Sequence, residues 1–301
     1  MKVTICIITY KRPAALTRLL ISLGALAFSE RDPDITIVVV DNEGSGEVMQ
    51  ICTELGSQIH WPIRCVTENQ RGLSFARNRA INEVGENADF VAFIDDDEMP
   101  DPCWLDALMR VQREYNADVV TGATFPQFTS APPRWISKGH FFERTEYPTG
   151  YSRSVARSSN VLLRAQIFRK IGGFDPRFAF TGGEDSHFFM RVHRAGFRII
   201  QANEAVVREW IPDSRMRAGW IVQRAFRCGT TYIRAETDLN PSFTVRISWM
   251  LRALARICKG LFEMLLAGIF VRHERVKSLQ RIANGFGIIA GLWGIRYEEY
   301  R

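Results

Sequence analysis

Between residues 90 and 98, five apolar residues run directly into four carboxylates, in the segment FVAFIDDDE. A continuous apolar run of this length is typical of a strand buried on both faces, as in a parallel sheet covered by helices. The carboxyl end of such a strand lies where open α/β sheets bind their ligands. Asp95 and Asp97 would then offer hard oxygen ligands to a divalent cation that already holds phosphates. For an isolated acidic run, a solvated turn at the end of a core strand is the simpler interpretation.

The rest of the first half favours the ligand-binding interpretation. Apolar strands are predicted at 3–8, 35–40, 63–67, 90–94 and 118–121, with amphipathic helices between the first four and before the fifth. This alternation predicts an α/β fold with a mostly parallel sheet flanked by helices and built from right-handed crossovers. Three of the strands end in polar residues at one edge: Thr9, Asp41 and Asp95. Neither a G-x-G-x-x-G turn after the first strand nor a G-x-x-x-x-G-K-[ST] loop occurs, so a metal on the acidic edge is the expected way to hold phosphates.

Composition limits the class of protein. The 301 residues are 46% hydrophobic and 24% charged, which suits one α/β domain with an appendage. The formal charge of +6 lies entirely in residues 241–301, which hold ten Lys/Arg and four Asp/Glu. The main domain is therefore not expected to bind nucleic acid. Six cysteines without metal-like spacing indicate reduced thiols and a cytoplasmic protein.

The second half carries one further acidic motif. Residues 125–151 are rich in proline and aromatic side chains, and either a functional lid or packed irregular structure fits them. Farther on, the glycine pair Gly182-Gly183 allows a tight turn into a helix that begins with Glu184 and Asp185. Acidic residues in a first helical turn commonly just complement the helix dipole. The glycine pair favours a functional role, since it would bring a carboxylate close to a ligand at the sheet edge.

Five motifs occur in an order that resembles the family-2 glycosyltransferases with a GT-A fold. They are TYKRP at 9–13, the strand that ends in Asp41, GLSFARN at 72–78, Asp95-x-Asp97 and Gly183-Glu184-Asp185. The resemblance covers roughly residues 1–215. The segments PRW at 133–135, GGED at 182–185 and WIPDSR at 210–215 are similar to the bacterial exopolysaccharide branch, and in particular to glucosyltransferases of succinoglycan-type assembly.

The resemblance implies a role for each motif. Asp41 would accept a hydrogen bond from the uracil of a UDP-sugar, and Asp185 would be the general base, with Glu184 as an orienting residue. The side chains expected to bind the nucleotide-sugar are Thr9, Tyr10, Arg12, Asp41, Arg77, Asp95 and Asp96. Asp95 and Asp97 would hold Mg²⁺ or Mn²⁺, while Glu98 is a weaker candidate at the same place. The residues expected at the acceptor are Trp135, Gly183 and His187, although a lone histidine on a helix is more often structural.

The implied reaction is an inverting, single transfer of a hexose from a nucleotide-sugar. The acceptor would be a glycan or a polyprenyl-linked oligosaccharide in surface or exopolysaccharide synthesis. Relatives often have a histidine where this chain reads Arg208-Glu209-Trp210, so a remaining protein ligand of the metal is not identified. The chain has neither the Q-x-x-R-W motif nor the membrane spans of processive synthases. A sugar-phosphate nucleotidyltransferase and a catalytically idle assembly partner are the alternatives.

Residues 1–240 are predicted to form the catalytic domain, divided into a nucleotide-binding half, 1–123, and an acceptor-binding half, 124–240. Residues 241–301 are predicted to form a basic amphipathic helical tail. Such a tail is typical of a protein that lies on the anionic inner face of the cell membrane. A helical cap packed on the catalytic domain and a dimer surface are the alternatives for the tail.

Overall fold

The computed structural model describes residues 1–266 and 271–299, and the chain divides into two compact units. The sheet unit comprises Met1–Phe125, Arg144–Ala179 and Glu184–Trp210. The helical unit comprises Pro126–Glu143, Phe180–Gly183 and Ile211–Arg301. This division differs from the predicted boundary at residue 240, because the helix before that boundary packs with the two helices after it.

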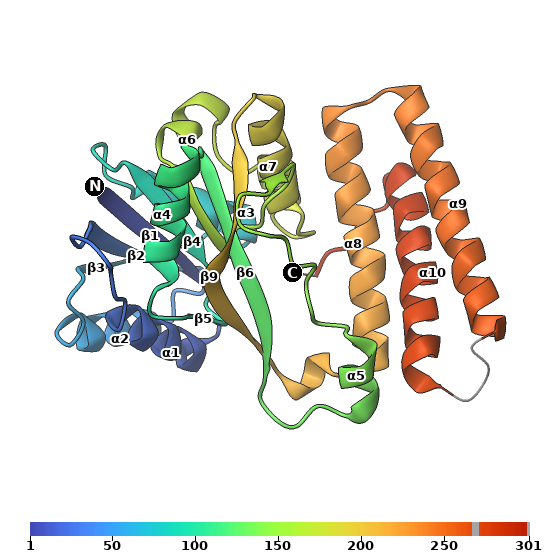
Figure 1. Cartoon of the computed structure of the whole chain (residues 1–301), viewed down its shortest axis with the longest axis horizontal. Coiled ribbons are helices and arrows are strands. Elements are labelled where there is room, and N and C mark those ends of the chain that lie inside the picture. The colour runs from blue at the N-terminus through green and yellow to red at the C-terminus, as the bar shows by residue number, and fades with distance from the viewer. Residues whose placement is uncertain (267–270, 300–301) are drawn as a thin grey trace. The chain divides into compact units, whose positions relative to one another are not determined.

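The sheet is mixed, and its first part is the parallel sheet that the sequence predicted (Figure 1). In chain order the strands are β1 (Lys2–Thr9), β2 (Asp34–Asp41), β3 (Ile63–Thr67), β4 (Phe90–Ile94), β5 (Glu98–Pro100), β6 (Val119–Phe128), β7 (Ser152–Arg153), β8 (Asn160–Arg164) and β9 (Ile199–Ile211). The order is β3-β2-β1-β4-β8-β6-β9-β5, with β7 beside β9. The pairs β2–β3, β1–β2 and β1–β4 are parallel, whereas β4–β8, β6–β8, β5–β9 and β7–β9 are antiparallel.

Alternate residues of the central strands enter two separate apolar cores, one on each face of the sheet. The first core joins β1, β2 and β4 to α1 (Pro13–Gly24), α2 (Glu47–Gly56) and α4 (Trp104–Tyr115). The second joins the other faces of these strands to α3 (Leu73–Asn82), α6 (Gln166–Ile171) and α7 (Glu184–Arg194). All five residues of β4 are buried. Burial on both faces explains why these strands have no polar alternation.

One buried amide fixes the sheet where it becomes antiparallel. Asn160 pairs with Ile94, the last residue of β4. Its carboxamide oxygen accepts a hydrogen bond from Trp104 Nε1 at 2.8 Å, and its nitrogen donates to the carbonyl oxygens of Ala123 and Ala205, both at 2.9 Å. A buried amide that uses both ends of its side chain is satisfied only in one arrangement. It therefore holds β6, β8, β9 and α4 in place behind the end of β4.

The helical unit is built around α8 (Ala218–Leu239), α9 (Phe243–Leu266) and α10 (Arg272–Leu292), with the short α5 (Arg134–Gly139) in the same unit. Helix α10 packs against both α8 and α9. Glycines on α10 permit this close packing: a Cβ on Gly287 would lie 2.1 Å from the Phe226 carbonyl oxygen. The glycine-rich apolar segment that begins at Gly285 is therefore a helix-packing surface. Within residues 1–266 and 271–299, no helix combines the length and apolar character needed to cross a bilayer.

Candidate active site

The carboxyl ends of β1 and β2 bring two of the predicted residues together. Thr9 and Asp41 are opposite each other in the parallel register, and both are buried. The adjoining loop is held by Asn42, whose side chain donates to the carbonyl oxygens of Glu68 and Gln70 and accepts from the backbone nitrogen of Gly72 at 2.9 Å. This loop leads into α3 through the GLSFARN motif. The sheet edge is thus rigid on the side where the sequence predicts the nucleotide.

Tyr10 follows β1 and lies between two cations. Lys11 Nζ is 5.3 Å from the centre of the Tyr10 ring, and the Arg71 guanidinium carbon is 4.9 Å from it. A half-buried ring with two cations beside it suits an aromatic, anionic ligand such as a nucleotide. Arg71 was not among the predicted site residues, because nothing in the sequence places it beside Tyr10.

The acidic run forms a structured turn between β4 and β5. The Thr9 hydroxyl donates to Asp96 Oδ2 at 2.8 Å, and Arg12 Nη1 donates to Asp96 Oδ1 at 2.9 Å and to Asp97 Oδ2 at 3.0 Å. Asp96 and Glu98 are 4% and 1% exposed. These carboxylates are therefore organised and buried, which rules out the solvated turn that the isolated motif allowed.

Burial and mutual repulsion make this turn electrostatically strained without a cation. Partial burial raises the pKa of Asp95, whose side chain is 39% exposed, to about 7; the charge of Arg77 opposes this shift and the neighbouring carboxylates add to it. Burial likewise raises the pKa of Asp96 to about 6 against Arg12, and it raises the pKa of Glu98. A divalent cation would relieve the repulsion, so the residues fit a hard metal ion.

The protein supplies few metal ligands at this edge. Among the described residues, no three carboxylates, imidazoles or thiols at the acidic turn bring their ligand atoms within 4.8 Å of one another. Asp95 and Asp97 would therefore leave most positions of an octahedral ion to the oxygens of a ligand or to water. A site of this kind suits an ion that arrives with a diphosphate.

Arg77 connects the acidic turn with the start of α7. This arginine of α3 is almost completely buried and donates to Glu184 Oε1 and, at 3.4 Å, to Asp95 Oδ1. Its guanidinium also lies over the Phe174 ring, 5.6 Å from the ring centre. Burial raises the pKa of Glu184, and the charge of Arg77 opposes that shift. A single guanidinium thus holds two carboxylates from elements far apart in the sequence.

Asp185 has a different environment from its buried neighbour Glu184. Gly182 and Gly183 have φ values of +73° and +86°, which glycine adopts freely, and α7 begins immediately after them. Asp185 is half-buried in the first turn, and its Oδ1 accepts from the backbone nitrogen of Ser186 at 2.6 Å and from the Ser186 hydroxyl at 3.3 Å. In the described part of the chain its Oδ2 accepts no hydrogen bond. Asp185 therefore has one oxygen oriented by the helix and one available to a ligand.

The structure adds a charged network that the sequence did not predict. Arg144 Nη2 donates to Glu209 Oε2 at 2.7 Å and lies 4.0 Å from Glu98 Oε1. Glu98 and Glu209 are paired across β5 and β9. Because Glu98 Oε2 also accepts from the backbone nitrogen of Asp95 at 3.3 Å, this network supports the acidic turn from behind.

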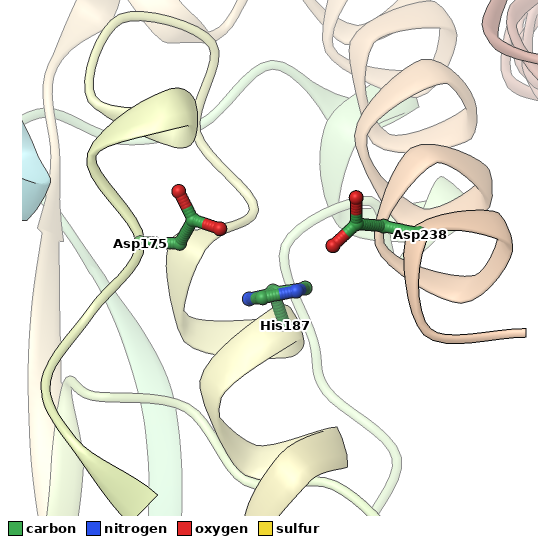
Figure 2. A group of neighbouring side chains, drawn as sticks. All are labelled: Asp175, His187 and Asp238. Carbon is green, nitrogen blue, oxygen red and sulfur yellow. The ribbon is translucent and has the colours of Figure 1, made fainter.

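The three predicted acceptor residues lie in different settings. Trp135 and Gly183 belong to the helical unit, where the Trp135 ring packs on Phe141 and has the Arg272 guanidinium 4.6 Å from its centre. His187 is 3% exposed and stacks on Phe178, with ring centres 4.8 Å apart. Figure 2 shows its imidazole on α7 near the carboxylate of Asp175. These are the surroundings of a histidine packed in the core, which is the structural role that a lone histidine on a helix more often has.

The Arg77–Glu184 pair leads to a stability prediction. Arg77→Met leaves Glu184 buried without its counter-charge, so the free energy of unfolding at neutral pH should fall by about 3–5 kcal/mol. Arg79→Met is the matched control: that arginine is 40% exposed and its partner Glu83 keeps Arg64, so the loss should be below about 1 kcal/mol. Urea denaturation measures both values.

The pH dependence of the same variant provides a check. Without the charge of Arg77, the folded-state pKa of Glu184 lies still further above its unfolded value. The loss of stability comes from the buried, ionised carboxylate, so it is present only at pH values where Glu184 is ionised. The loss in Arg77→Met should therefore shrink as the pH falls towards the unfolded pKa of a glutamate. Equal losses for the Arg77 and Arg79 variants at all pH values would contradict a buried ion pair.

The fold is the GT-A fold of solved glycosyltransferase structures. The mannosyltransferase PcManGT from Pyrobaculum calidifontis, solved with GDP-Man and Mn²⁺, matches with a TM-score of 0.65 at 16% identity over 97% of this chain and 87% of its own. The S. aureus protein TarS 1-349, solved with UDP-GlcNAc, matches with a TM-score of 0.54 at 15% identity over 99% and 93%. These likenesses show the fold.

The family follows from the sequence comparisons. The family model of glycosyl transferase family 2 matches residues 4–172, and that of glycosyl transferase family group 2 matches residues 90–273. The chain belongs to glycosyl transferase family 2. It is 30% identical to the succinoglycan biosynthesis protein ExoM of Rhizobium meliloti (strain 1021), over 99% of this chain and 95% of that protein. It is 26% identical to a glucosyl-dolichyl phosphate glucuronosyltransferase of Haloferax volcanii, over 79% and 78%.

Proposed function

We propose that this protein transfers one hexose from a UDP-sugar to a glycan or polyprenyl-linked oligosaccharide, with inversion and with Mg²⁺ or Mn²⁺, in exopolysaccharide synthesis. The observation that carries the proposal is the bridge made by Arg77. It links Asp95 of the acidic turn to Glu184, the residue directly before Asp185. A candidate metal and diphosphate site and a candidate base are thereby held in one rigid unit, as a group transfer requires.

The nucleotide would bind at the edge formed by β1 and β2. Asp41 is buried, and its Oδ1 already accepts from the backbone nitrogen of Glu43 at 2.9 Å, which orients the carboxylate. An oriented, buried carboxylate suits the imide N–H of uracil, a donor that pairs with a charged acceptor. Tyr10 would line the base pocket, and Arg12 and Arg77 would face the ribose and diphosphate. The structures of PcManGT and TarS with GDP-Man and UDP-GlcNAc support a nucleotide-sugar donor.

Asp95 and Asp97 would hold the divalent ion, with Asp96 bound to Thr9 and Arg12 behind them. When bound, such an ion neutralises the negative charge that accumulates on the leaving diphosphate. The Arg144–Glu209 pair would keep Glu98, and through it the backbone of Asp95, in position. The Mn²⁺ in the PcManGT structure supports a divalent cofactor of this kind.

Asp185 would act as the general base in a single displacement. The acceptor oxygen forms a bond to the anomeric carbon while the bond from that carbon to the UDP oxygen breaks with its electron pair. Asp185 Oδ2 takes the hydroxyl proton as the new bond forms. Attack on the face opposite the leaving group converts an α-linked donor into a β-linked product. Glu184, fixed by Arg77, would orient the first turn of α7 and take no proton.

The acceptor and pathway are inferred from the relatives. The name of the R. meliloti protein connects it with succinoglycan biosynthesis, and that of the Haloferax protein with a dolichyl phosphate carrier. A growing oligosaccharide on a polyprenyl carrier is the acceptor that fits both. Such an acceptor would be met at the cytoplasmic face of the membrane, where nucleotide-sugars are available.

A panel of nucleotide-sugars tests the donor. UDP-hexoses with Mg²⁺ or Mn²⁺ should raise the melting temperature by about 5 °C when the donor is about 100-fold above its Kd. Asp41→Asn should abolish the shift, whereas Asp34→Asn, at the exposed start of the same strand, should keep it. A shift with GDP-mannose but not with UDP-sugars would contradict a uridine nucleotide as the donor. An equal shift in EDTA would contradict the dependence of donor binding on a metal ion.

A further inference from the structure

Helix α9 uses one face for packing and leaves another face without a partner in the described residues. Its buried residues are Ala253, Ile257 and Gly260. These residues face α10: a Cβ on Gly260 would lie 2.6 Å from the Ile282 side chain, and the Ile257 side chain meets Gly285. Helix α10 also lies against α8, so within the described residues of the helical unit α9 is covered along one side (Figure 1).

The uncovered side of α9 is apolar along its whole length. The α9 stripe consists of residues at i, i+4, i+8, i+11, i+18 and i+22, which lie on one face of a helix. Its members and their exposures are Phe243 75%, Ile247 44%, Leu251 61%, Leu254 45%, Leu261 49% and Leu265 82%. Phe262 and Leu266 widen it at the C-terminal end, at 61% and 70%. A continuous exposed apolar face of this length marks an interaction surface.

The charges beside the stripe are positive. Helix α9 has four Lys/Arg and one Asp/Glu, Glu263. Arg252 and Lys259 are exposed on the flank of the stripe, where the Arg252 guanidinium lies over the Trp249 ring, 4.9 Å from its centre. Glu263 already pairs with Arg281 and, at 4.0 Å, with Lys259. The flank therefore has a net positive charge towards any partner.

We propose that the α9 stripe lies in the surface of an anionic lipid bilayer, parallel to its plane, with Arg252 and Lys259 at the lipid headgroups. An apolar face with a cationic flank is the pattern of helices that lie in a membrane interface. Anionic headgroups attract the lysine and arginine side chains, and the acyl boundary accepts the leucines. This membrane surface belongs to α9 and is separate from the proposed reaction.

A second copy of this chain is the competing occupant, and the charges disfavour it. Pairing two α9 stripes would bring the Arg252 and Lys259 side chains of both copies towards the same seam. Glu263, the sole acidic residue of α9, is already paired within its own chain. Like charges at a helix seam destabilise the pairing, whereas an anionic surface neutralises them.

Vesicle co-sedimentation of the full chain tests this surface. The protein should bind vesicles of phosphatidylglycerol and phosphatidylcholine and should bind pure phosphatidylcholine far more weakly. The variant Leu251→Gln/Leu265→Gln should lower the partition coefficient about ten-fold or more, because it removes apolar area from the stripe. Both leucines are largely exposed, so their replacement should leave the fold unchanged. Ile21→Gln is the matched control: Ile21 is 58% exposed on α1, and its replacement should change nothing.

A second pair of variants tests whether the positive charges beside the α9 stripe contribute to vesicle binding. Arg252→Gln/Lys259→Gln should reduce binding to the anionic vesicles, whereas Arg31→Gln/Arg169→Gln, two exposed arginines of the sheet unit, should not. Equal partition of wild type and stripe variant, or no binding of wild type to anionic vesicles, would overturn the proposal. So would a concentration-dependent dimer in light scattering that the stripe substitutions abolish. Since no donor is present, these outcomes do not depend on the proposed reaction.

Discussion

Replacing Asp185 with asparagine should lower the rate of sugar transfer by about 10²–10⁴-fold, the usual contribution of a positioned general base. Asparagine has the same shape but cannot take the proton of the acceptor hydroxyl. Its side-chain oxygen can still accept from Ser186, so the first turn of α7 should be preserved. The loss should therefore appear in kcat, while the Kd for UDP stays unchanged. Initial rates with the donor identified by the panel and calorimetric titration of UDP measure the two quantities.

Ser186→Ala is the matched control for this variant. It removes the hydroxyl hydrogen bond to Asp185 Oδ1 at 3.3 Å but keeps the backbone bond and the carboxylate. Its rate should fall by about ten-fold, because one long hydrogen bond to a charged group is worth roughly 1.5 kcal/mol. Full transfer activity in Asp185→Asn would show that another residue takes the proton.

Replacing Asp97 with asparagine should weaken metal-dependent donor binding by about 10²-fold or more, since even the loss of a group that only hydrogen-bonds to a metal ligand changes metal affinity by about 10–100-fold. The same change should leave the fold intact, because Asp97 is only one of two carboxylates that Arg12 contacts. Asp101→Asn is the control: this aspartate follows β5 and pairs with Arg208 away from the acidic turn. Titration of the donor with and without Mg²⁺ separates the two variants. Unaltered metal dependence in Asp97→Asn would place the ion elsewhere.

The raised pKa values give the proposed metal site a pH dependence of definite sign. Asp95, with a pKa of about 7, and Asp96, with a pKa of about 6, are partly protonated in the metal-free protein at mildly acidic pH. A metal ion binds the ionised form, so binding releases protons and the affinity should rise with pH up to about 7 and then level off. In the metal-free protein these raised values favour folding at low pH, and that contribution is lost as the pH rises through 6 to 7. Calorimetry in two buffers of different ionisation enthalpy measures the released protons.

The parallel half of the sheet could be predicted because its signals are local. Each buried strand has an apolar run, each helix has its own periodicity, and residues at strand ends share an edge wherever the strands are parallel. Thr9 and Asp41 were placed together on that basis, and their register confirms it. The family and the GT-A fold were likewise predicted from short motifs in order, and the comparisons confirm both.

The antiparallel half could not be predicted in the same way. Strand β9 carries Glu204, Arg208 and Glu209 among its apolar residues, so it has no continuous apolar run. Its pairing with β5 joins Glu98 to a residue 111 positions farther along the chain, and no local pattern encodes such a pairing. Arg144 and Glu209 were therefore missed as supports of the acidic turn. Helices α8 and α10 meet through glycines whose partners the sequence does not reveal.

The most direct test of the proposed function follows a UDP-hexose by ¹H NMR in the presence of the wild-type protein and Mg²⁺, with water as the acceptor. The proposed mechanism predicts release of UDP that stops in EDTA and in Asp185→Asn, with the β-anomer of the free sugar appearing first from an α-linked donor. Equal turnover in EDTA, first appearance of the α-anomer, or formation of UMP and a sugar phosphate in place of UDP would contradict an inverting, metal-dependent glycosyltransferase.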